Sequence, residues 1–145
     1  MTANHPLKLS LFVACLMAAS SGFAADAKMS REDYKAAKDK ISADYKVDKA
    51  VCDKLTDNAK DVCDKQAKAK EKIAIAELEY NRSGTDRDRV KLANVKAEQE
   101  YAVAKEKCDD QTGDAKNICQ KEAKAAEARA KAEIKHDKKV AASTH

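Results

Sequence analysis

Apolar and small residues recur every three or four positions over four stretches of this 145-residue chain, with charged residues between them. The second stretch shows the spacing most clearly. Its seam positions alternate by three and four: Ala59, Val62, Gln66, Ala69, Ile73, Ala76 and Tyr80. This is the period of an α-helix with one narrow apolar seam. The pattern predicts four helices, over about residues 31–53, 59–81, 86–109 and 115–138.

Polar residues that can accept the first backbone amides of a helix precede each stretch. The predicted N-caps are Ser30, Asn58, Thr85 and Asp114. An acid follows the first three caps by three positions, which suits the helix dipole. The only glycines after residue 24, Gly84 and Gly113, fall where helices should stop.

Four cysteines repeat one spacing. Cys52 and Cys63 are separated by ten residues, and Cys108 and Cys119 repeat this pattern 56 positions later. Residues 28–80 and 84–136 align without a gap, with about twenty identical positions. A repeat of this length is a supersecondary unit, so the sequence predicts the same helical hairpin twice in tandem.

The cysteines lie about one turn from each hairpin loop. Four cysteines allow three pairings. In an antiparallel hairpin, Cys52 and Cys63 face each other near the Cα spacing of roughly 5.5 Å that a disulfide needs. The repeat gives Cys108 and Cys119 the same relation, which favours the two local pairs.

The predicted fold is all-α, with two tandem disulfide-stapled antiparallel hairpins at residues 25–82 and 83–138. They form either a loose four-helix bundle or an extended coiled-coil-like pair, and residues 139–145 form a disordered tail. In the second hairpin Ala97 and Arg129 replace Ile41 and Ile73. Because it has less apolar area to bury, the second hairpin is predicted to be the looser one.

Residues 1–24 have the pattern of a secretory signal peptide. Lys8 precedes an apolar run, and small residues lead to a cut after Ala24. The run is shorter than the roughly 20 residues of a membrane span. An anchor helix, or lipidation at Cys15, is the alternative. We therefore expect a periplasmic protein without a transmembrane segment in its mature chain, in a compartment where disulfides form.

The composition after residue 24 supports only a thin core. It holds 15 Leu, Ile and Val residues, four Tyr and no Trp, so disulfides are expected to supplement the packing. Loss of Lys8 lowers the formal net charge from +4 to +3. Such a small and interspersed charge gives no indication of nucleic-acid binding.

Few residues indicate chemistry. Two cysteine pairs could converge on a metal, but zinc sites favour closer spacing, and His136 has no partner at ligand spacing. Tyr45 and Tyr101 could stack on a ligand, although a tyrosine in a helix seam explains them as well. The basic run at residues 65–72 could touch anionic lipid, but its interleaved acids favour a solvated face with ion pairs.

No nucleophile motif, phosphate loop or carboxylate pair is present, so the sequence predicts a protein that is not an enzyme and has no cofactor. The predicted function is a structural, interaction or envelope-stress role. The alternative is sequestration of a metal or small ligand through thiols, His136 and carboxylates.

Three segments carry a resemblance to a known group of proteins: residues 34–41 (YKAAKDKI), 58–63 (NAKDVC) and 101–108 (YAVAKEKC). Together with the paired cysteine blocks, they resemble small, secreted, uncharacterised proteins of β-proteobacteria. These proteins are often labelled TolA-like for their helices rich in Ala, Lys and Glu. The resemblance implies a periplasmic protein and carries over no catalytic residues.

Overall fold

A computed structural model of the protein describes residues 29–143, which form four α-helices. The helices are α1 (Arg31–Cys52), α2 (Asp57–Ser83), α3 (Asp86–Lys107) and α4 (Gly113–Ser143). A short 3-10 helix, η1 (Cys108–Asp110), precedes α4. The predicted all-α fold of two stapled antiparallel hairpins is confirmed. The predicted signal peptide, with Cys15, lies outside the described residues.

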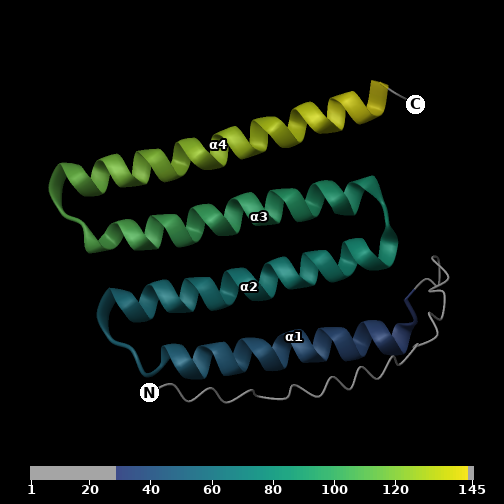
Figure 1. Ribbon diagram of the computed structural model, residues 1–145, viewed down its shortest axis with the longest axis horizontal. Helices are drawn as coiled ribbons and strands as arrows, with labels where there is room; N and C mark the ends of the chain where they lie inside the picture. The colour runs from purple at the N-terminus through teal and green to yellow at the C-terminus, as the bar shows by residue number, and fades with distance from the viewer. Residues whose placement is uncertain (1–28, 144–145) are drawn as a thin grey trace, which may run out of the picture.

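The four helices lie side by side in chain order and form a layer one helix thick (Figure 1). Helix α2 packs against both α1 and α3, and α3 packs against both α2 and α4. Among residues 29–143, α1 and α4 share no comparable interface. Because α1 and α4 do not pack together, the hairpins do not close into a bundle. They do not stand apart either, because α2 and α3, one from each hairpin, form the most extensive interface of the layer.

The two central helices bury residues on opposite sides. On α2, Ala67 lines a groove with Cys52 of α1, whereas Ala76 lines a groove with α3. On α3, the buried Ala97 faces α4 and the buried Gln99 lines the groove with α2. Small residues on both sides let neighbouring helices approach closely, but each contributes little apolar area. The core is therefore three thin seams and not one interior.

Two of the predicted helix caps are confirmed. The backbone N–H of Asp33 donates to Ser30 Oγ at 3.0 Å, and that of Asp88 donates to Thr85 Oγ1 at 3.2 Å. Gly84 ends α2 with a left-handed φ of 63°, and its N–H donates to the Tyr80 carbonyl. Because glycine adopts this conformation without strain, α2 and α3 are joined by only two residues.

The start of α2 differs from the predicted Asn58 cap. The helix begins at Asp57, and Thr56 holds the N-cap position without a side-chain hydrogen bond. Asp57 has a φ of 53°, which turns the chain into the helix one residue before Asn58. Helix α4 begins in the same way at Gly113, with a φ of 56°. This glycine therefore starts a helix, and Asp114 lies in the first turn instead of capping it.

The end of α4 also differs from the prediction, because residues 139–143 are helical and not a disordered tail. No glycine or proline follows Gly113, so no residue type in this stretch stops a helix. The last turn also has a neighbour, since Ala141 and Ala142 line a groove with Val90 near the start of α3.

Candidate functional site

Both predicted disulfides are present. Cys52–Cys63 joins α1 to α2 with a Cα separation of 5.4 Å, and Cys108–Cys119 joins η1 to α4 with a Cα separation of 5.6 Å. Cys52 and Cys108 are fully buried. The α1–α2 and α3–α4 links lie at the same end of the layer (Figure 1), so both staples fix that end. Two structural disulfides indicate an oxidising compartment.

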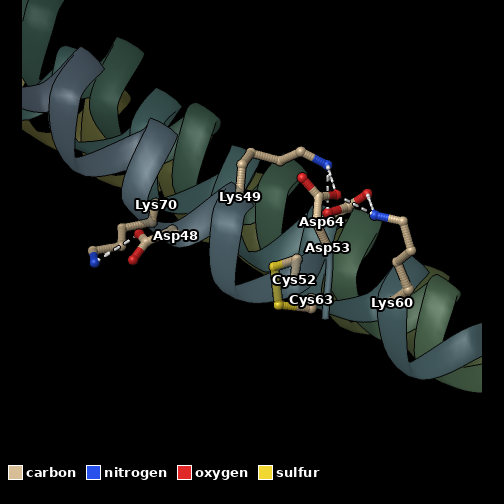
Figure 2. The surroundings of a disulfide bond; sticks show 8 residues. All are labelled: Asp48, Lys49, Cys52, Asp53, Lys60, Cys63, Asp64 and Lys70. Atoms are coloured by element: carbon tan, nitrogen blue, oxygen red, sulfur yellow. Dashed lines mark hydrogen bonds and ion pairs between the residues drawn. A yellow bond between two sulfur atoms is a disulfide. The ribbon is translucent and has the colours of Figure 1, made fainter. Parts of the chain in front are cut away.

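Two lysines and two aspartates form an ion-pair ring beside the first disulfide (Figure 2). Lys49 Nζ lies 2.6 Å from Asp64 Oδ1, and Lys60 Nζ lies 2.6 Å from Asp53 Oδ1. Longer contacts of 3.4 Å (Lys60–Asp64) and 3.8 Å (Lys49–Asp53) close the ring. The ring therefore links the end of α1, the loop and the start of α2 across the staple.

The charges of the ring shift its own ionisation. The hydrogen bond from Lys60 lowers the pKa of Asp53, and the close ion pair with Lys49 lowers the pKa of Asp64. In return, the hydrogen bond to Asp53 raises the pKa of Lys60. At neutral pH each carboxylate is thus ionised and paired with a lysine. Such a ring stabilises the hairpin and offers no group poised to exchange a proton.

The second staple keeps one short ion pair of this ring. Lys116 Nζ lies 2.8 Å from Asp109 Oδ1 and lowers the pKa of that carboxyl. Gln120 stands where the first hairpin has Asp64, and its Nε2 is 3.4 Å from Asp109 Oδ1. We did not predict the ring from the sequence. Its signal was there: Lys49, Asp53 and Lys60 all recur 56 positions later.

The tyrosines of α1 lie in the seam with α2. Lys68 lies over the ring of Tyr45, 5.0 Å from its centroid, and Arg82 lies 4.4 Å from the ring centroid of Tyr34. The Tyr34 hydroxyl donates to Glu79 Oε1 at 2.5 Å, and this hydrogen bond raises the pKa of Tyr34. These cation–π and hydrogen-bond contacts account for the tyrosines as seam residues.

The two hairpins carry equivalent grooves. The α1–α2 groove is lined by Tyr45 and Ala74, and the α3–α4 groove by Tyr101 and Ala130 at the matching positions. The cavity volume is about 40 Å³ in the first groove and about 130 Å³ in the second. The second groove is wider because alanines replace larger side chains along it: Ala97 replaces Ile41, Ala104 replaces Asp48, and Ala126 replaces Lys70. Both are shallow grooves on the layer and not enclosed pockets.

A groove of about 390 Å³ lies between the start of α3 and the end of α4. Arg87, Arg89 and Lys138 line it together with Asp86. Arg89 Nε already pairs with Asp86 Oδ1 at 3.0 Å. The groove is therefore basic in part but contains its own counter-charge.

The basic run at residues 65–72 contributes to ion pairs. Lys65 pairs with Glu106 of α3, Lys68 with Glu71, and Lys70 with Asp48 of α1. The run thus links α2 to both neighbouring helices. This matches the predicted solvated face with ion pairs more closely than a lipid-binding patch.

The groups named for metal or ligand binding are not brought together. All four cysteines of the hairpins are in disulfides. His136 Nδ1 lies 3.7 Å from Asp137 Oδ1, with both side chains exposed. Within residues 29–143 we find no group of three or more His, Cys, Asp or Glu side chains placed to hold a metal ion. In the same residues, no helix is long and apolar enough to cross a membrane.

Comparisons of the chain with protein-family models, with curated proteins and with solved structures find no match.

Proposed function

We propose that this protein is a non-enzymatic periplasmic protein with a structural or interaction role in the cell envelope. The observation that carries the proposal is the single layer of helices. A layer one helix thick leaves both faces open to partners, whereas an enzyme of this size usually encloses a pocket. The ion pairs and the two disulfides keep such a layer in shape without a large core.

The proposed location rests on two features. The first 24 residues have the pattern of a cleaved signal peptide. The two disulfides fit an oxidising compartment. Expression of the full chain in a Gram-negative host tests this directly. We expect a periplasmic protein that begins at Ala25 and contains no free thiol. A product that keeps residues 1–24, or carries lipid on Cys15, would contradict the proposed processing.

The role itself can be tested by capture of partners from the periplasm with the oxidised protein as bait. The matched control is the same chain after reduction and alkylation, because it has the same composition without the staples. We expect discrete envelope proteins on the oxidised bait that the alkylated chain does not retain. Equal capture by both baits would contradict a role that depends on the fold. A stoichiometric metal in the purified oxidised protein would instead support sequestration.

A further inference from the structure

The 56-residue repeat of the sequence is also a repeat of the structure. The disulfides, the Asp53–Lys60 and Asp109–Lys116 ion pairs and the two tyrosine-lined grooves recur at matching positions. Helix α3 is therefore the equivalent of α1, and α4 is the equivalent of α2. It follows that the outer side of α1 corresponds to the side of α3 that packs on α2. The outer side of α4 corresponds in the same way to the side of α2 that packs on α3.

The α2–α3 interface shows what these two sides do when they meet. Lys96 Nζ of α3 lies 2.8 Å from Glu77 Oε1 of α2. Gln99 of α3 and Ala76 of α2 are both buried and line the same groove. A small residue and a buried side-chain amide thus lie together in the seam, and an ion pair flanks it.

The equivalent residues on the outer sides of the layer are exposed. The α1 outer row comprises Ala36, Ala43, Val47 and Ala50, which match Leu92, Gln99, Val103 and Glu106 of α3. The α4 outer row comprises Ile118, Ala125, Ala128 and Ala132, which match Val62, Ala69, Lys72 and Ala76 of α2. All eight residues are exposed, and the largest of them, Val47 and Ile118, are 64% and 56% exposed. Each outer row has the spacing of a helix seam without a neighbouring helix in the described chain.

The residues of one flanking ion pair are also retained. Lys40 on α1 stands at the position of Lys96, and Glu133 on α4 stands at the position of Glu77. Lys40 pairs with Asp44 of its own helix at 2.7 Å. If α4 of one molecule packed on α1 of another as α2 packs on α3, Lys40 would come within reach of Glu133 and could form the equivalent of the Lys96–Glu77 ion pair. The α1 edge of one copy is therefore complementary to the α4 edge of another.

We propose that a second copy of the chain docks on this edge, with its α4 outer row against the α1 outer row of the first. The contact repeats the α2–α3 interface between molecules. It is heterologous, so each added copy leaves one α1 edge and one α4 edge open, and the layer can grow copy by copy. This inference goes beyond the proposed function and does not depend on it.

The contact is weaker than its internal counterpart. Asp39 replaces Val95, and Ala50 replaces Glu106, which pairs with Lys65 in the α2–α3 interface. The internal contact is also favoured by its two-residue link, which holds α2 and α3 at a high effective concentration. Association between copies is therefore reversible and rises with protein concentration.

Sedimentation velocity on the oxidised protein tests this over a wide range of concentration. We expect the average mass to increase with concentration for the native chain. Val47→Glu on the α1 outer row and Ala125→Glu on the α4 outer row should each weaken association by on the order of tenfold or more, because an unpaired carboxylate would be buried. Ser42→Glu is the matched control, since Ser42 is exposed on α1 and does not belong to the outer row.

The decisive measurement mixes the two edge variants. Each keeps the edge that the other has lost, so an equimolar mixture should form a one-to-one dimer and grow no further. Likewise, Lys40→Glu should weaken association, and Glu133→Lys on the other molecule should restore it. Circular dichroism melts of each variant alone check that all of them fold.

Three results would overturn the proposal. The first is a native chain that stays monomeric at every concentration. The second is association that neither edge variant weakens. The third is a mixture of edge variants that fails to recover, which would indicate contact between identical surfaces. Each result is obtained with purified protein and leaves the capture experiment on other partners unaffected.

Discussion

Asp57 and Gly113 occupy the same position in the two hairpins, and both have a left-handed backbone, with φ values of 53° and 56°. Glycine adopts this conformation freely, whereas a residue with a Cβ atom is strained in it. Aspartate tolerates it better than most residues. The turn before the second helix of each hairpin is thus built in the same shape from two different residues.

Replacement of Gly113 by Ala should lower the free energy of unfolding by about 1 kcal/mol, because the new Cβ atom strains the left-handed turn. Beyond its chain neighbours and the backbone of its own helix, an added Cβ atom would meet no atom within 4 Å, so backbone strain is the main expected cost. Asp57→Ala is the matched control and should cost less, since the native residue already carries a Cβ atom. Urea denaturation of both variants measures the difference. Equal losses at the two positions would contradict this explanation.

Removal of one disulfide should lower stability by about 2.5–3 kcal/mol in the chain-entropy model, because each closes a short loop. With so thin a core, this is a large share of the total stability. We expect the Cys108→Ala/Cys119→Ala and Cys52→Ala/Cys63→Ala variants to melt well below the native chain. Reduction of both disulfides should lower Tm by about ten degrees or more. Circular dichroism at 222 nm follows the melts, and an unchanged Tm would mean that the helix seams are sufficient.

Acid should destabilise the protein through its paired aspartates. Lysines lower the pKa of Asp53, Asp64 and Asp109 in the folded chain below their ordinary value of 3.8. Their stabilisation is therefore present above pH 3.8, the value for the unfolded chain, and is lost as the pH falls through the lower folded pKa values. Denaturation between pH 7 and pH 2 measures the loss. Asp64→Asn should make it smaller, and an unchanged acid response would show that the ring contributes nothing.

The rate of amide hydrogen exchange in each helix should depend on how many neighbouring helices it has in the layer, and not on which hairpin it belongs to. The sequence predicts a looser second hairpin, but α3 has a neighbouring helix on both sides, whereas α4 has one. We expect the amides of α2 and α3, which have two neighbouring helices, to be more protected than those of α1 and α4, which have one. Mass spectrometry of the oxidised chain resolves the four helices. If α3 and α4 exchanged together and faster than α1, the hairpin would be the opening unit after all.

Much of the fold follows from local pattern. The repeat and the position of Cys52 and Cys63 near a loop are enough to predict the hairpins and both staples. Ser30 and Thr85 are predicted correctly as caps because a cap depends only on neighbouring residues. The predicted N-cap at Asn58 is wrong because α2 begins one residue earlier, at Asp57, which has a left-handed backbone. A glycine at this position would have indicated that conformation in the sequence, whereas an aspartate does not.

The arrangement of the helices could not be predicted in the same way. The seam through Ala69 and Ala76 is visible in the sequence of α2, but the opposite side, with Ala67, is interrupted by lysines. Such a side looks solvated, although Lys70 pairs with Asp48 of the neighbouring helix α1. Only one of the two buried sides of α2 can therefore be recognised from the sequence. A helix with one apolar side fits a bundle as well as a layer, so the sequence does not distinguish the two arrangements.

Every interface in the layer joins helices that are consecutive along the chain. No part of the fold has to wait for a distant segment, so the entropy lost in closing loops before packing can begin is small. Such a chain can fold progressively from its N-terminus while later residues are still being delivered, each helix docking on the one before it. The same property keeps any transient, half-formed molecule close to the native arrangement.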